Sequence, residues 1–159
     1  MKLLMIFLLV FWGSNHDSEI HKSIDFKDVT IVIPAEWSVK EKEDCLFVWK
    51  GKVQPVSYLR MCRVISSGES DYFTMNDDKI WEAITNGIPV LTDVSVTTEY
   101  TGMSAIVLCK YKDNAGYHTD KCFQAEIELP TNIKFIFVGR GDSSFFKSYK
   151  KIYLSFKIK

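Results

Sequence analysis

The chain has 159 residues, of which 47% are hydrophobic, 14% aromatic and 25% charged. Its 20 basic and 20 acidic residues give a formal net charge of zero. This profile is typical of a single globular domain. It excludes a disordered chain, and it argues against a general nucleic-acid binder, which needs an excess of positive charge for phosphates.

The N-terminal residues have the layout of a secretory signal peptide. Lys2 is followed by an apolar run from Leu3 to Trp12 and then by small and polar residues up to Ser18. Such a run rises only about 15 Å as a helix, half of a bilayer core, so no transmembrane anchor is expected. We expect residues 1–18 to direct export to the periplasm, with a buried first strand or helix as the alternative.

The remaining residues are expected to form a short tether over 19–23 and a single domain over 24–159. Hydrophobic alternation predicts strands throughout this domain. In chain order they are expected at 26–33, 37–39, around Cys45, around Cys62, at 94–100, at 105–109, at 122–127 and at 133–138.

The four cysteines fit an exported domain, because each of two pairs is symmetric about a predicted turn. Cys45 and Cys62 lie in strand-like runs on either side of one turn, and Cys109 and Cys122 flank another. Residues opposed on antiparallel strands have Cα atoms about 4.5–5.5 Å apart, which a disulfide spans. The sequence therefore predicts disulfides Cys45–Cys62 and Cys109–Cys122. Four buried free thiols are the alternative.

The cysteine pairs also set the expected strand registers. The first hairpin places Trp49 opposite Tyr58 on the face turned away from the core, where the two rings leave aromatic surface to be covered. The second hairpin places Leu108 opposite Phe123 and Ile106 opposite Ala125, again on a core face. A helix of the same chain or a partner protein would cover the aromatic surface.

Two helices are predicted. Asn76 is a good N-cap, Ile80, Trp81 and Ile84 share a face, and Gly87 is a stop signal, so a helix is expected over 77–86. A second helix is expected after Asp142. Its apolar face comprises Phe145, Phe146, Tyr149, Ile152, Tyr153 and Phe156. The expected fold is therefore α+β, an antiparallel sheet of about six to seven strands with two helices packed on it.

No catalytic set is recognisable in the sequence. Nucleophilic catalysis needs a base beside a serine or cysteine, and beyond His16 and His21 the chain contains only His118, which is expected in an exposed loop. No Cys-x-x-Cys motif is present, and the histidines do not cluster with the cysteines. We expect no enzyme activity, no cofactor and no metal, with a small enzyme that uses His118 as a remaining alternative.

Several short motifs resemble the PsbP-like superfamily, which also includes bacterial envelope proteins similar to DcrB. They are IPAEW at 33–37, the predicted helix at 77–86, GMSA at 102–105 and YLSF at 153–156. The resemblance covers about residues 24–157. It implies an α/β/α sandwich, an antiparallel sheet between helices, and a binding role without chemistry.

Export, neutrality, predicted disulfides and the lack of a catalytic set together predict a periplasmic immunity protein, a monomer or homodimer. It would bind and occlude a toxin of the cell envelope, such as a peptidoglycan hydrolase or lipase delivered by type VI secretion. The alternative is a DcrB-like envelope accessory factor. The residues expected to contact the toxin are Trp49, Lys52, Val53, Gln54, Tyr58, Tyr117 and His118.

Overall fold

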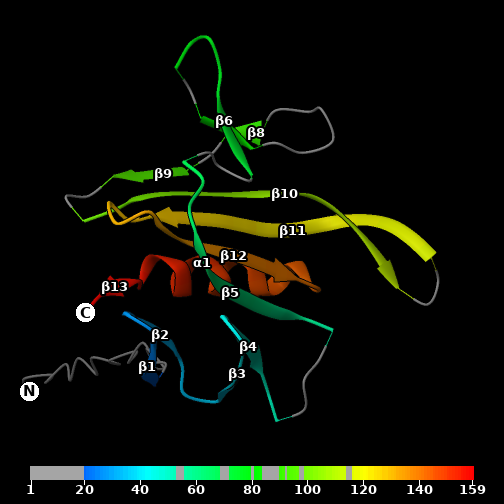
Figure 1. Cartoon of the computed structure of the whole chain (residues 1–159). Coiled ribbons are helices and arrows are strands. Elements are labelled where there is room, and N and C mark those ends of the chain that lie inside the picture. Colours follow the sequence, from blue (N-terminus) through cyan, green and yellow to red (C-terminus); the bar gives the residue numbers. More distant parts are fainter. Residues whose placement is uncertain are drawn as a thin grey trace, which may run out of the picture.

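The computed structural model describes residues 20–52, 56–68, 72–79, 81–83, 90–91, 93–96, 99–113 and 116–159 (Figure 1). In chain order the strands are β1 (His21–Phe26), β2 (Val29–Pro34), β3 (Trp37–Lys42), β4 (Cys45–Lys50), β5 (Tyr58–Ile65), β6 (Phe73–Met75), β7 (Trp81–Ala83), β8 (Val90–Leu91), β9 (Asp93–Val96), β10 (Thr101–Asp113), β11 (Gly116–Glu128), β12 (Ile133–Arg140) and β13 (Lys157–Ile158). A 3₁₀ turn, η1 (Ser143–Phe145), leads into the helix α1 (Phe146–Leu154).

The expected α+β sandwich with two helices is wrong. Strands make up 62% of the structure, and its one helical segment has 12 residues. The strands form three sheets: a seven-stranded antiparallel sheet in the order β3-β4-β5-β12-β11-β10-β9, and two three-stranded sheets, β1-β2-β13 and β6-β7-β8. The chain is therefore mostly β, with helical residues only at 143–154 among those described.

The helix expected over 77–86 is not formed. Asn76 instead begins a turn in which the Lys79 N–H donates to the Asn76 carbonyl oxygen at 3.0 Å, and Lys79 adopts a positive φ of 61°. The chain then returns antiparallel, so that Met75 pairs with Trp81. Asparagine and aspartate favour both helix N-caps and turns, because their side chains bond to nearby backbone. In this structure the residues after Asn76 form a turn and not a helix start. Trp81 lies in a strand, where aromatic residues are favoured.

The predicted C-terminal helix is confirmed, and it lies between the seven-stranded sheet and the β1-β2-β13 sheet (Figure 1). Asp142 caps the η1 turn that leads into α1 by accepting the Ser144 N–H at 2.8 Å, and this backbone hydrogen bond lowers the pKa of the Asp142 carboxyl. Its buried side chains are Phe146, Tyr149, Ile152 and Tyr153. They pack in the main core with the inward-facing residues of β2, β11 and β12. The apolar face of α1 thus joins the two sheets.

Gly139 lets β12 approach α1 closely. A Cβ atom built at this position would lie 2.3 Å from Cδ2 of the Tyr149 ring. That ring is fully buried, its hydroxyl donates to the Arg140 carbonyl oxygen at 3.2 Å, and burial raises the pKa of the phenol. The ring therefore has little room to move aside.

We expect Gly139→Ala to lower the free energy of unfolding by about 1–3 kcal/mol through overpacking. Urea unfolding followed by tryptophan fluorescence measures the change. The double variant Gly139→Ala/Tyr149→Leu should lose less stability than the sum of the two single variants, because the shorter side chain relieves the collision. Strict additivity would contradict this explanation.

Both predicted disulfides are confirmed, with Cα–Cα distances of 4.0 Å for Cys45–Cys62 and 5.9 Å for Cys109–Cys122. Cys45 and Cys62 are directly opposite, as expected. The second hairpin differs from the expected register: Cys109 lies opposite Asp120, and Cys122 lies opposite Val107. This pair is diagonal, but both side chains remain on one face, because strand side chains alternate with a period of two.

The N-terminal sheet contains residues that the sequence assigns to other roles. His21–Ser23, expected in a tether, begin β1, and the segment 26–33, expected as one strand, turns at Lys27 and Asp28 into β2. Lys27 has a positive φ of 52° in this turn. The predicted signal peptide lies outside the described residues. No helix in the described part of the chain is long and apolar enough to cross a bilayer.

A smaller core lies on the opposite face of the seven-stranded sheet, where the β6-β7-β8 sheet sits away from α1 (Figure 1). It contains Phe73, Ala83, Met103, Ala105, Val107 and the Cys109–Cys122 disulfide. Beside it lies a buried ion pair, in which Lys134 Nζ is 3.7 Å from Glu126 Oε2 and both side chains are 2% exposed. Glu126 Oε1 also accepts the Tyr72 N–H at 2.9 Å, and so ties the start of β6 to β11.

Candidate functional site

The hairpin of β10 and β11 extends beyond the rest of the seven-stranded sheet (Figure 1). On one side β9 pairs only with residues 101–104 of β10, and on the other side β12 pairs only with residues 123–128 of β11. Among the described strands, residues 105–113 of β10 therefore pair only with β11, and residues 116–122 of β11 pair only with β10. We call this two-stranded ribbon the arm.

The arm is stiffened by its disulfide. An isolated two-stranded hairpin is marginally stable in water. Here Cys109 and Cys122 cross-link the two strands, and both sulfur-bearing side chains are buried beside Phe73 and Ala83. The disulfide therefore anchors one face of the arm on the small core and leaves the other face open.

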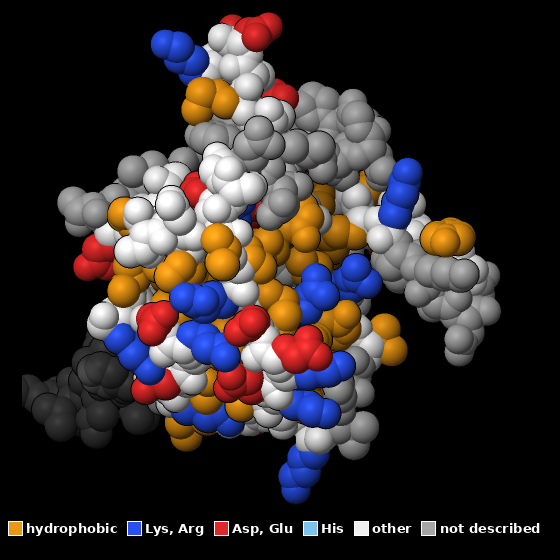
Figure 2. All heavy atoms as spheres, in the orientation of Figure 1, with side chains coloured by type: hydrophobic (Ala, Val, Ile, Leu, Met, Phe, Trp, Pro, Cys, Tyr) orange, Lys and Arg blue, Asp and Glu red, His pale blue; other side chains and the backbone are white. Residues whose placement is uncertain are grey.

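The open face of the arm carries apolar and basic side chains. Strand alternation and the observed register place six residues on it, which we call the arm face: Ile106, Leu108, Lys110, Tyr117, Thr119 and Lys121. Ile106 is 51% exposed, Leu108 43% and Tyr117 82%. In Figure 2, apolar side chains gather below the β10–β11 ribbon and are bordered by charged side chains of both signs. Three exposed large apolar residues on one protruding face form a surface typical of protein contacts.

The structure separates the residues expected to contact a partner into two groups. Tyr117 and His118 lie on the arm, whereas Lys52 is exposed just after β4 and Tyr58 begins β5. Tyr58 pairs with Arg140 at the end of β12, and the neighbouring Gly139 pairs with Phe123 of β11. Both groups thus lie at one end of the sheet, although Tyr117 lies roughly 20 Å farther along its strand than Phe123.

The other residues that were expected to contact a partner offer it little described surface. Val53 and Gln54 lie outside the described residues. Trp49 is only 6% exposed, so its ring offers little surface to a partner. Tyr58 contacts Phe47 instead, with ring centroids 5.9 Å apart. The aromatic pair expected across the first hairpin is therefore not an exposed patch.

Sequence reasoning missed Ile106 and Leu108, which it placed on a core face. In the observed register Leu108 lies opposite Lys121, beyond the last residue of β11 that β12 covers. The unequal strand lengths are the signal that identifies them: β10 and β11 each have 13 residues, whereas β12 has 8. Side chains of β10 and β11 have no neighbouring side chains from β12 beyond the point where β12 ends.

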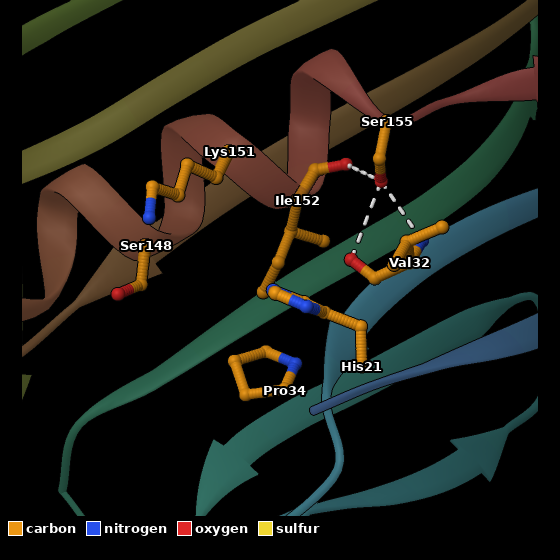
Figure 3. Close-up of a pocket in the computed structure, with 7 residues that line it drawn as sticks. All are labelled: His21, Val32, Pro34, Ser148, Lys151, Ile152 and Ser155. Carbon is orange, nitrogen blue, oxygen red and sulfur yellow. Dashed lines mark hydrogen bonds between the residues drawn. The ribbon is translucent and has the colours of Figure 1, made fainter. Parts of the chain in front are cut away.

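A separate pocket of about 320 Å³ lies between α1 and the β1–β2 hairpin (Figure 3). It is lined by His21, Val32, Pro34, Ser148, Lys151, Ile152 and Ser155. In Figure 3 the His21 ring points toward Ile152, and the Lys151 side chain runs along α1 above Ser148. The pocket therefore combines an apolar wall with basic and hydroxyl groups.

Ser155, one of the two serines that line the pocket, has a structural role. Ser155 Oγ accepts the Val32 N–H at 2.8 Å and donates to the Ile152 carbonyl oxygen at 2.6 Å, so it serves to join β2 to the end of α1. His118, the candidate base, lies on the arm and not among the residues that line this pocket. The described residues contain no group of three or more histidine, cysteine or acidic side chains that could hold a metal.

The PsbP-like resemblance implies helices on both faces of a sheet, and the strand at 81–83 replaces one of those helices. The resemblance itself stays a prediction from short motifs. The chain matches no known protein-family model, and no curated protein is similar to it in sequence.

Proposed function

We propose that the protein is a periplasmic immunity protein that binds a cell-envelope-targeting toxin through the arm face and occludes its active site. The observation that carries the proposal is the arm itself, a disulfide-anchored ribbon whose open face presents Ile106, Leu108 and Tyr117. A protruding element reaches into a cleft, which a flat surface does not. The two disulfides are consistent with an exported protein, because such bonds persist in oxidising compartments.

The composition of the arm face favours a protein partner. Interfaces are enriched in aromatic anchors, and tyrosine combines a large apolar ring with a polar tip. Pre-organisation by the disulfide lowers the entropy lost on binding. Lys110 and Lys121 are exposed beside the apolar residues. They favour an acidic rim around the toxin's cleft and would speed association at low salt.

Co-expression with the secreted hydrolase or lipase encoded by a neighbouring gene tests the proposal. The toxin is directed to the periplasm with and without this protein, and growth and co-purification are measured. We expect protection together with a stable complex. Toxicity that persists when this protein is present in excess would contradict the proposal.

Substitutions on the arm face test the surface. Leu108→Glu/Tyr117→Ala should weaken toxin affinity at least about 30-fold, because it removes two central anchors. Leu154→Glu is the matched control, since Leu154 is an exposed leucine on α1, and it should leave the affinity unchanged. Calorimetric titration with the toxin compares them. Equal losses from both variants would place the interface elsewhere.

A further inference from the structure

We propose that the pocket between α1 and the β1–β2 hairpin binds a small amphiphile with one anionic head group. The residues that line the pocket belong to β1, β2, α1 and the residue after α1, and none of them belongs to the arm (Figure 1). The inference is therefore independent of the proposed toxin contact. Three properties of the pocket support the inference: its apolar wall, the sign of the charges around its opening, and its volume.

The apolar wall suits a hydrocarbon body. Val32 and Pro34 belong to β2, and Ile152 belongs to α1 (Figure 3). Ser155 fixes these two walls relative to each other, because its hydroxyl bonds to Val32 of β2 and to Ile152 of α1. Hydrogen bonds from one side chain to the backbones of β2 and α1 thus hold the two walls of the pocket together. Ligand pockets commonly combine such an apolar lining with a few placed polar groups.

The charges around the pocket select an anion. None of the seven lining residues is acidic, and two of them, His21 and Lys151, carry basic side chains. The helix α1 has the sequence FKSYKKIYL, which contains three lysines and no acid. The lysines raise the local potential and offset the partial negative charge at the C-terminal end of the helix. The side chain nearest to a bound head group is Lys151, with the Ser148 hydroxyl beside it (Figure 3).

The volume limits the size of the ligand. A pocket of about 320 Å³ is at the lower end of the range of small-molecule sites, about 300–1,000 Å³. A medium-length alkyl chain fits such a space, and a two-chain lipid does not. Carboxylate and phosphate heads share the required chemistry, so both enter the experiment.

Titration of the protein with octanoate and octyl phosphate, each below its micelle-forming concentration, tests the inference by amide chemical shifts. We expect saturable shifts confined to β1, β2 and α1, with a dissociation constant of about 1 mM for the better anion. The relative affinity of the two anions identifies the head group. Octanol and octylammonium should bind at least about fivefold more weakly.

A pair of lysine variants supplies the control. Lys151→Gln should weaken binding about fivefold, whereas Lys147→Gln, on the same helix but outside the pocket, should change it less than about twofold. Ser148→Phe should abolish binding by filling the space beside Lys151. Equal binding of octanol, equal effects of the two lysine variants, or shifts centred on the arm would each overturn the proposal.

Discussion

Lys134→Ala should lower the free energy of unfolding by about 3–5 kcal/mol, because it removes a buried cation that lies beside the buried carboxylate of Glu126. Lys134 Nζ and Glu126 Oε2 are 3.7 Å apart, and both side chains are 2% exposed. The pair lies between β11 and β12, under the β6-β7-β8 sheet. The interaction with a cation offsets the desolvation cost of a buried carboxylate, and this offset is lost when the cation is removed.

The variant is measured by urea unfolding against Lys27→Ala as its control. Lys27 forms ion pairs with Glu41 at 3.4 Å and Asp44 at 3.3 Å at the surface. Exposed pairs of this kind contribute less than about 1 kcal/mol. If Lys134→Ala lowered the free energy of unfolding no more than Lys27→Ala does, the buried pair would contribute no more to stability than a surface pair.

The double variant Lys134→Met/Glu126→Gln distinguishes a charge effect from a packing effect. It removes both charges but keeps the volume of the two side chains. Because replacement of a whole buried pair is often close to neutral, we expect the double variant to be more stable than Lys134→Ala. Amide hydrogen exchange at Tyr72 should also increase in Lys134→Ala, since the Tyr72 N–H donates to Glu126.

The elements that sequence reasoning predicts correctly are those in which a long pattern and a local signal agree. Four of the six predicted apolar positions are buried in α1, Phe145 ends η1 and Phe156 follows the helix, and Asp142 caps η1, which leads into α1. By contrast, the segment 76–86 contains only a short apolar pattern, and its polar residues satisfy a turn as well as a helix start. Pairing with β6 decides the outcome, and such tertiary contacts are not visible in a local window.

The disulfides and their registers show a similar limit. Symmetry about a turn identifies both pairs, but it also implies directly opposite cysteines, which holds only for Cys45 and Cys62. The arm closes at the pair Asp113–Gly116, so Cys109 and Cys122 are diagonal neighbours. That two-residue difference moves Leu108 away from Phe123. The exposed face of the arm then follows from where β12 ends, which depends on the whole sheet.

Removal of the first disulfide by Cys45→Ala/Cys62→Ala should lower the free energy of unfolding by about 3 kcal/mol, the chain-entropy value for a loop of about 15 residues. The two cysteines are separated by 17 positions and join neighbouring strands within the seven-stranded sheet. The loss of stability should therefore affect the whole seven-stranded sheet and not one segment of it. Urea midpoints should fall, and the slope of the transition should rise, because the denatured chain without the cross-link exposes more surface. Affinity for the proposed toxin should not change, because β12 separates β5 from β11.

Cys109→Ala/Cys122→Ala is the matched comparison, and its two cysteines have a sequence separation of 13. Its chain-entropy cost is similar, but the arm lacks further strand neighbours among the described residues. We therefore expect faster hydrogen exchange confined to 105–113 and 116–122, together with weaker binding of the proposed toxin. The two double variants thus separate stability from recognition. If the arm kept its protection and its affinity without the disulfide, pre-organisation would not be the role of Cys109 and Cys122.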